Sequence, residues 1–447
     1  MRLPTNAGAP DAAASAATPQ PRSTTTRPHD DPQRRSLHDE IHARPPARLF
    51  TPERIGHLAL RIPPEERADE EAALAALASQ HGMPAPSFDA GYLWLDCGAY
   101  RLKWERHTEF STLTVYHAVA ADVPGEGRAL EVVPAVWRAR LPGSTIVYAE
   151  VDVRRGVEDD LRDAIASFGD TPVIGARVAD AAGYALTDLR MDEQGCTRFV
   201  VVDVSLTPRQ AGRLAQRLLE IETYRMMALL AFPAARAATG PLAEAERRLA
   251  AITERLASMQ ASDEGALLDD LMHVAADVEQ RDAATRFRFG AASAYHHLVR
   301  QRIAELREQR LPGVQTLGEF MERRLAPAMA TCESVARRQE ELSARVARAG
   351  QLLRTRVEVA LARQNQALLE SMNRRARLQL RLQRTVEGLS IAAITYYAAG
   401  LTGYVAKAAK VAGAPLDADL IVAIAIPLIA GALWFALRRI RRGLEDA

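Results

Sequence analysis

Two hydrophobic periods follow one another along this chain of 447 residues. Between residues 54 and 206, apolar and polar positions alternate, or β-branched residues gather, in short runs that turn residues separate. A period of two is typical of half-buried β-strands. The runs are HLALRIP, YLWLDC, YRLKWERH, STLTVYHAV, TIVYAEVDV, PVIGARVAD, YALTDLRM and RFVVVDVSL. We expect each of them to be a strand.

The short connections predict how some of these strands pair. CGAY joins the second run to the third, and HTEF joins the third to the fourth, so residues 92–119 should form a β-meander. Two amphipathic segments, residues 65–82 and 157–169, end in glycine, as helices commonly do. Residues 33–206 are therefore predicted to be an α+β domain with a mostly antiparallel sheet.

The hydrophobic period becomes helical at Thr207, which can cap a helix that begins with Pro208. This helical stalk is predicted to extend over residues 207–387, and from residue 315 onward only Pro327 interrupts its pattern. At 1.5 Å per residue, that last helix would reach roughly 100 Å. Its apolar stripe consists of Leu342, Val346, Ala349, Leu353, Val357, Leu361, Leu368 and Met372.

A helix of that length cannot bury an apolar stripe by itself. We expect the helices between Pro241 and Arg310 to cover one side of the stripe and to leave its C-terminal part bare. The bare part predicts that the chain is a homo-oligomer whose stalks pack as a coiled coil.

Two uncharged segments follow the stalk: GLSIAAITYYAAGLTGYVA, residues 388–406, and LIVAIAIPLIAGALWFAL, residues 420–437. Each is close to the length of about 20 residues that crosses a bilayer as a helix. Two buried core helices would be the alternative, but arginines flank the pair on both sides. We therefore expect a transmembrane hairpin over residues 388–437, with the lipid bilayer as a partner of the chain.

The flanking arginines also predict the orientation of the hairpin. The positive-inside rule places both arginine clusters in the cytoplasm and the short connecting loop outside. Both termini are then cytoplasmic, and residues 438–447 form a basic cytoplasmic tail. The residues that set this topology are Arg374, Arg375, Arg377, Arg381, Arg384, Arg438, Arg439, Arg441 and Arg442.

Composition changes this picture little. Residues 1–32 are rich in Ala, Thr, Ser and Pro, which predicts a disordered tail. The formal net charge of +1 gives no reason to expect nucleic acid as a partner. The three cysteines are far apart and odd in number, which favours reduced thiols in a cytosolic compartment.

One short motif resembles a metal site. In HDEIHARPP, His38 and His42 are four residues apart, like the zinc ligands of His-Glu-x-x-His proteases. Here Glu40 stands one residue later than in that motif. No third ligand follows by spacing, although His57 and His107 are candidates in space. The alternative is a short helix that ends at Arg44, because a residue before proline disfavours the α-helical region. No cofactor is predicted, a divalent cation remains one option, and no catalytic set emerges, so we expect no enzyme.

The overall layout resembles that of the CorA-type divalent-cation transporters, with a cytoplasmic domain, a long stalk helix continuous with the first span, and a basic tail. That family carries a Gly-Met-Asn signature at the outer end of its first span, whereas this chain has Gly400-Leu401-Thr402-Gly403-Tyr404. The resemblance implies a homo-oligomer with the first spans at its centre. The pore or helix-packing candidates in this region are Ala399, Gly400, Thr402 and Gly403.

A second resemblance is more specific. DEIHARPP, TRFRFGAASAYHHLVRQRIAELREQRLPGVQTLGEFMERRLAPAM and LARQNQALLESMNRRARLQLRLQRTVEGLSIAAITYYAAGLTGYVAKA are similar to the bacterial DUF3422 family of uncharacterised membrane proteins. The similarity extends over roughly residues 33–440. It implies a multi-pass protein of the bacterial inner membrane and no particular activity.

Three function classes follow. The first is a membrane-anchored interaction or sensing protein with a large cytoplasmic domain. The second is a divergent CorA-type channel or transporter for divalent cations that lacks the Gly-Met-Asn signature. The third is a membrane-tethered metalloenzyme that uses His38 and His42. We rank the first slightly ahead, because the transport signature is missing and no catalytic constellation is present.

Overall fold

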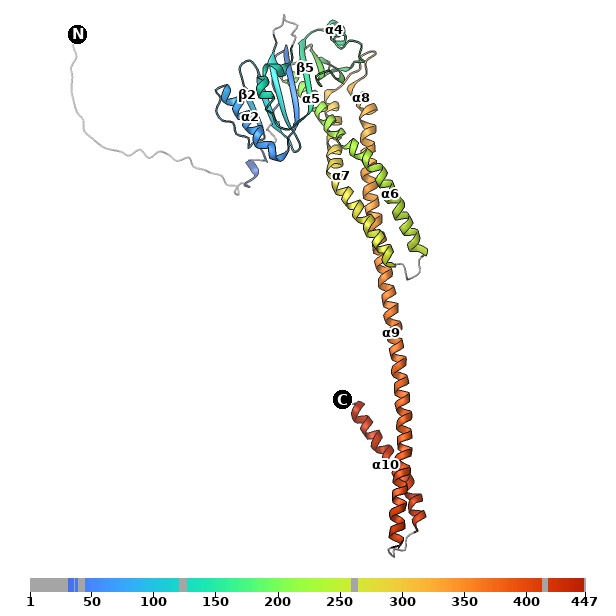
Figure 1. Ribbon diagram of the computed structural model, residues 1–447. Coiled ribbons are helices and arrows are strands. Elements are labelled where there is room, and N and C mark those ends of the chain that lie inside the picture. The colour runs from blue at the N-terminus through green and yellow to red at the C-terminus, as the bar shows by residue number, and fades with distance from the viewer. Residues whose placement is uncertain are drawn as a thin grey trace, which may run out of the picture. The chain divides into compact units, whose positions relative to one another are not determined.

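The protein is described here by a computed structural model, which covers residues 31–35, 37–38, 45–119, 127–258, 264–411 and 417–445 (Figure 1). The predicted tail, residues 1–32, lies almost entirely outside these ranges. The chain forms two compact units. The first comprises Met1–Thr239 and Ala283–Arg337, and the second comprises Gly240–Asp282 and Arg338–Ala447.

The first unit contains one mixed sheet of eight strands. The strands are β1 Glu53–Arg61, β2 Tyr92–Asp96, β3 Arg101–Arg106, β4 Ser111–Ala118, β5 Ser144–Arg155, β6 Ile174–Val178, β7 Gly183–Met191 and β8 Thr197–Asp203. Their spatial order is β2-β3-β4-β1-β5-β8-β7-β6, and only the pair β5–β8 is parallel among the described strands. The α+β class, the eight strands and the meander β2-β3-β4 are confirmed.

The described helices fall into two groups along the chain. Those between the strands are η1 Pro64–Glu66, α2 Arg67–Gln80, η2 Ala129–Val132, α3 Ala135–Arg138, η3 Glu158–Asp160 and α4 Leu161–Ala166. The others are α5 Pro208–Leu229, α6 Ala231–Ser258, α7 Glu264–Leu306, α8 Leu317–Arg324, α9 Ala326–Val411 and α10 Ala418–Glu445. The break between α5 and α6 falls at Leu230, and Pro241 lies inside α6.

Helix α5 covers one face of the sheet, which we call the α5 face. Thr207 caps the helix, with its hydroxyl accepting a hydrogen bond from the backbone N–H of Gln210 at 3.3 Å. Alternation along β5 directs Val147, Ala149, Val151 and Val153 to this face, and all four are buried. The intervening Tyr148, Glu150, Asp152 and Arg154 therefore lie on the opposite face.

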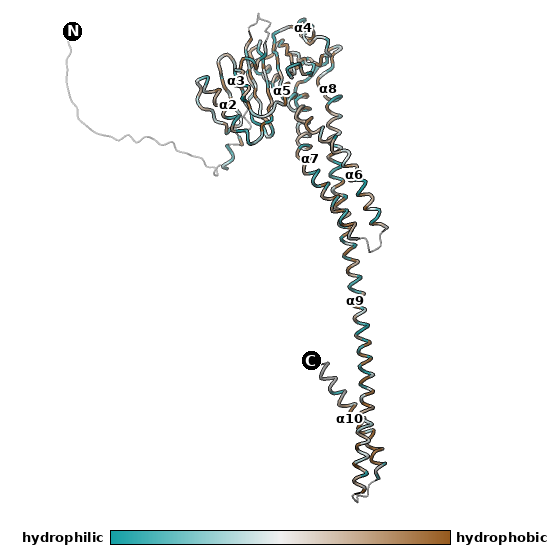
Figure 2. The backbone as a smooth tube through the Cα atoms, in the orientation of Figure 1, coloured by the Kyte–Doolittle hydropathy of each residue, from teal (hydrophilic) through white to brown (hydrophobic). Residues whose placement is uncertain are grey.

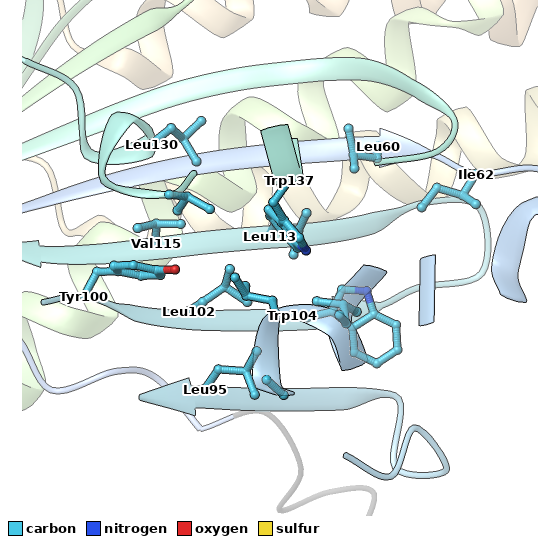
Figure 3. Close-up of a cluster of buried hydrophobic side chains, with 14 residues drawn as sticks. Leu60, Ile62, Leu95, Tyr100, Leu102, Trp104, Leu113, Val115, Leu130 and Trp137 are labelled. Atoms are coloured by element: carbon cyan, nitrogen blue, oxygen red, sulfur yellow. The ribbon is translucent and has the colours of Figure 1, made fainter. Parts of the chain in front are cut away.

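The opposite face carries two apolar clusters. The larger one packs α2 and Trp137 of α3 on strands β1 to β4, and it includes the fully buried Leu102 and Trp104 (Figure 3). The smaller one packs α4 and Phe168 on β7 and β8. Burial of each large apolar side chain contributes about 1.5–3 kcal/mol to folding. These clusters hold the two ends of the sheet and leave its middle, β1, β5 and β8, for polar side chains.

In the second unit, parts of α6, α7 and α9 pack against one another. Arg338 on α9 pairs with Glu246 on α6 at 2.8 Å, and Arg255 on α6 pairs with Asp270 on α7 at 2.8 Å. Apolar side chains fill the space between the segments. They are Leu242, Leu249, Ile252, Leu267, Leu271, Val274, Leu342, Val346, Ala349 and Leu353, all buried.

The apolar stripe of α9 changes its environment along the helix. Its N-terminal part, from Leu342 to Leu353, is buried as expected, whereas Leu361, Leu368 and Met372 are more than half exposed. Helix α9 then continues without a break to Val411, so the stalk is one helix with the first uncharged segment. Figure 2 shows hydrophobic residues along the last turns of α9 and along α10.

Candidate functional site

In the described part of the chain, three helical stretches are long and apolar enough to cross a membrane: residues Pro208–Ala257, Ala326–Ala409 and Asp419–Ala436. They differ in how much of their apolar surface the protein itself covers. In the first stretch, α5 is packed on the sheet, and Leu214, Leu218, Ile221 and Met227 are buried. In the other two, large apolar side chains point outward, such as Tyr397, 75% exposed, and Leu428, 67% exposed.

The small residues predicted for pore or packing lie on different sides of α9. Ala399 is buried, and a Cβ atom on Gly403 would lie 3.2 Å from Cγ2 of Val422 in α10. Gly400 is exposed, and the Thr402 hydroxyl donates to the carbonyl oxygen of Ala398 at 2.8 Å. Gly403 therefore faces α10 of the same chain, as a small residue at a close helix contact would.

The arginines that set the predicted topology are not brought together into a site. Arg374, Arg375, Arg377, Arg381 and Arg384 are exposed around α9. Arg438 and Arg439 are exposed on α10, where Arg438 lies over the ring of Trp434 at 4.9 Å. The side chains of Arg441 and Arg442 lie outside the described residues, although both belong to α10. The basic tail is thus helical as far as Glu445.

The predicted metal pair, His38 and His42, lies partly outside the described residues. His38 is exposed, and His42 lies outside the described residues. Within the ranges that the structure describes, no group of three or more His, Cys, Asp or Glu side chains could hold a metal ion.

A buried polar cavity lies on the α5 face, and the sequence motifs did not reveal it. Its volume is about 310 Å³, and its walls come from β1, β3, β4, α5 and α7. Lys103 is 2% exposed and pairs with Glu105 at 2.9 Å. Arg302 of α7 forms an ion pair with Glu220 of α5. In the sequence, the cavity could have been predicted from polar residues at inward-facing positions of β3 and β4, such as Lys103 and Thr112.

His57 occupies the centre of this cavity wall and connects the sheet to α5. Its Nδ1 lies 2.9 Å from the Thr114 hydroxyl, and its Nε2 lies 3.1 Å from the Thr223 hydroxyl of α5. Burial is the main cause that lowers the pKa of His57 to about 3, and the positive charges of His107 and Lys103 contribute to the same shift. The imidazole is therefore neutral at pH 7 and serves as a hydrogen-bond bridge between two layers.

The polar groups of the α5-face cavity mainly satisfy one another. Lys103 has Glu105, Arg302 has Glu220 and Glu305, and both nitrogens of His57 are engaged. Burial also raises the pKa of Tyr116, so its hydroxyl stays protonated. A closed network of this kind fixes the position of α5 on the sheet.

The sequence was compared with known proteins, solved structures and family models. No curated protein and no solved structure matches the chain. A family model described as "Protein of unknown function (DUF3422)" matches residues 29–444, which includes the sheet, the stalk and both C-terminal helices. The chain belongs to the DUF3422 family.

Proposed function

We propose that this protein is a membrane-anchored interaction or sensing protein of the bacterial inner membrane. In this proposal, the end of α9 from residue 388 and helix α10 form a transmembrane hairpin. The observation that carries it is the outward position of large apolar side chains on these two segments, such as Tyr397, Leu401 and Leu428. Side chains of this kind are stable in contact with lipid and costly in contact with water.

The apolar stretch Pro208–Ala257, which contains α5, is not part of the proposed anchor. Helix α5 uses its apolar side to cover the sheet, and its buried side also carries Glu222 and Thr223, which bond to Arg225 and His57. Moving α5 into lipid would expose the apolar face of the sheet and break these bonds. Two spans therefore remain, an even number that keeps both termini on one side.

Arginine asymmetry supports the cytoplasmic side for the α+β domain. The arginines before the first span and those after the second are exposed where the structure describes their side chains, as residues next to anionic headgroups should be. The loop between the spans has no comparable cluster, since it balances Lys407 and Lys410 against Asp417 and Asp419.

Self-association through the stalk is part of the same proposal. The helices α6 and α7 cover the α9 stripe only as far as Leu353, and the exposed part continues through Leu361, Leu368 and Met372. A second copy of the same helix offers a matching apolar face, which favours a homo-oligomer with coiled-coil stalks. Because Gly403 lies against Val422 of α10 in its own chain, we favour the stalk as the interface over these small residues.

A divergent CorA-type cation channel is the second candidate. The unbroken helix α9, which joins the stalk to the first uncharged segment, favours it. Two spans per chain can enclose a pore only in an oligomer. Flux of Mg²⁺ or Co²⁺ into liposomes that contain the purified protein distinguishes the two candidates, because an anchor without a pore gives no flux above that of empty liposomes.

Reporter fusions test the anchor itself. A phosphatase reporter at Ala414 should be active in the periplasm, and a fluorescent reporter at either terminus should fold in the cytoplasm. The matched control is the chain truncated before residue 388, fused to the same reporters, which should remain in the soluble fraction. A cytoplasmic signal at Ala414, or full-length protein that alkaline washing removes from membranes, would refute the hairpin.

A further inference from the structure

A second cavity lies on the opposite face of the sheet, between the two apolar clusters. Its volume is about 600 Å³, within the usual range of about 300–1,000 Å³ for small-molecule sites. The strands β1, β5, β8 and β7 form its floor, and Phe168 and Arg128 lie at its sides. Five arginines line it, namely Arg54, Arg128, Arg154, Arg190 and Arg198. We call it the arginine cavity.

Local geometry keeps the middle of the sheet open for these side chains. The pairing of β7 with β8 shifts between Thr187 and Met191, and Leu189 there has a φ of 52°, which is uncommon outside glycine. This irregularity places Asp188 and Arg190 at the rim. On the other side, Gly56 lets Leu130 of η2 approach β1, because a Cβ atom there would lie 2.8 Å from Leu130 Cγ.

The aspartates of the arginine cavity are already engaged by neighbouring groups. Asp152 accepts from Arg154 at 2.6 Å and lies 3.9 Å from Arg54. Asp192 forms an ion pair with Arg128 and also accepts from the backbone N–H groups of Gln194 and Cys196. Because the carboxylate oxygens of these aspartates already accept hydrogen bonds from neighbouring groups, they leave little acceptor capacity for the other guanidinium donors of the cavity.

Asp188 is engaged in the same way. It accepts from the Thr171 hydroxyl at 3.2 Å and from the backbone N–H of Arg190 at 3.2 Å. Neither bond uses a guanidinium group of the cavity.

Three of the five arginines, Arg128, Arg190 and Arg198, differ from these aspartates in how far neighbouring groups engage them. Nη1 of Arg128 is buried and has no hydrogen-bond partner among the described residues. The guanidinium of Arg190 makes no hydrogen bond or ion pair with any residue in the described ranges. Arg198 donates to the carbonyl oxygen of Ser167 and stacks on the ring of Phe168 at 4.5 Å. Three cationic groups from three different elements thus converge on one cavity.

We propose that the arginine cavity binds a small anionic molecule through a carboxylate or phosphate group. Guanidinium groups recognise both anions with paired, charge-assisted hydrogen bonds. Arg128 and Arg190 would hold the anionic group, and the flat Arg198–Phe168 pair would support the rest of the molecule. This inference gives a ligand class to the proposed sensing role, and its test does not depend on how the protein inserts into a membrane.

Glu150 adds a pH dependence to this site. It lies beside Arg198 in the β5–β8 register, and Arg54, Arg128, Tyr148 and the thiol of Cys196 also act on it electrostatically or by hydrogen bonding. Burial raises its pKa to about 7. As the pH rises through 7, Glu150 gains a negative charge, so the affinity for an anion should fall. Burial also raises the pKa of Cys196 to about 12, so this thiol stays neutral.

Calorimetric titration of the full-length protein in detergent tests the proposal. The probes are sulfate, citrate and adenosine monophosphate, at low ionic strength, because salt screens such contacts. We expect one molecule bound per chain with a Kd of about 1 mM or tighter for at least one probe. Preference for citrate would identify a carboxylate ligand, and preference for the nucleotide would identify a phosphate ligand.

Substitutions then locate the binding. Arg190→Gln and, separately, Arg128→Gln should each weaken binding about tenfold, because each removes one charge-assisted contact. Arg140→Gln, an exposed arginine outside the cavity, is the control and should leave affinity unchanged. Sulfate affinity should fall between pH 6 and pH 8 in the unmodified protein and stay constant in Glu150→Gln.

Three results would overturn the proposal. They are no binding of any probe up to about 10 mM, binding that neither arginine substitution weakens, or sulfate affinity that does not change between pH 6 and pH 8. A thermal unfolding curve of each variant shows whether it is folded. Because the Arg190 side chain is exposed and unengaged in the described structure, its removal should leave that curve unchanged.

Discussion

Helices α5 and α10 show that the same apolar character has two different outcomes in this protein. Both lie in stretches that are long and apolar enough to cross a membrane. In α5 the apolar side chains meet a sheet whose facing residues are apolar too, and Leu218 is 1% exposed. In α10 none of the described part of the chain covers Leu428, which is 67% exposed. Hydropathy alone identifies an apolar helix, and the surrounding structure determines whether that helix is core or anchor.

The largest effect should follow from a charge placed on the buried side of α5. Leu218→Asp would bury an unpaired carboxylate against the sheet, so we expect a loss of at least about 4 kcal/mol in the free energy of unfolding. Denaturant titration followed by tryptophan fluorescence measures it, since Trp94, Trp104 and Trp137 lie in the sheet domain. Arg213→Asp, at an exposed position of α5, should change stability little. Equal effects of the two changes would mean that α5 is not packed on the sheet.

A charge on α10 should impair membrane insertion and leave the stability of the sheet domain unchanged. Leu428→Arg places a guanidinium near the middle of the second uncharged segment, which costs about 2.5–3.5 kcal/mol for membrane insertion. We expect less protein to resist alkaline extraction from membranes, while the unfolding curve of the sheet domain stays the same. Leu428→Ile is the matched control. If Leu428→Arg remained fully membrane-bound, α10 would not be in contact with lipid.

Acid should weaken the attachment of α5 through His57. The folded-state pKa of about 3 lies below the usual value near 6.5, so the unfolded chain takes up a proton first. Stability should therefore fall by about 1.4 kcal/mol per pH unit as the pH decreases from 6.5 towards 3, in addition to other groups. His57→Gln should remove that part of the slope, and His273→Gln, at an exposed position, should not. Unfolding midpoints measured at several pH values provide the comparison.

The smallest effect on folding should come from the exposed stripe of α9. Leu368→Asn changes a side chain that is 56% exposed, so we expect less than about 0.5 kcal/mol in the stability of one chain. The same change should reduce the oligomer fraction measured by light scattering in mild detergent, because it removes an apolar contact between stalks. Gln366→Asn, on the other side of the helix, serves as the control. A chain that is monomeric before any substitution would contradict stalk association.

Local periodicity was sufficient to predict much of this protein. Alternation in runs such as YRLKWERH, or gathered β-branched residues in runs such as RFVVVDVSL, predicted all eight strands, and the cap at Thr207 with Pro208 predicted the start of α5. The stalk helix and the two apolar C-terminal helices followed from composition and the spacing of apolar residues. These features depend on residues close together in the chain, so the sequence alone determines them.

Both cavities required the tertiary structure. Arg128, Glu150, Arg190 and Arg198 come from separate elements, and only the sheet order places β5 beside β8 and brings their side chains together. In the sequence, His57 is one polar residue in a predicted strand. Only the folded structure brings it into hydrogen-bond contact with Thr114 and Thr223. Likewise, the stripe of α9 is uniform in sequence, yet folding covers Leu353 and leaves Leu368 exposed. The sequence alone determines the hydrophobic periodicity and the charged residues, because both depend on local order in the chain. Long-range packing determines which apolar side chains are buried and which charged side chains are paired.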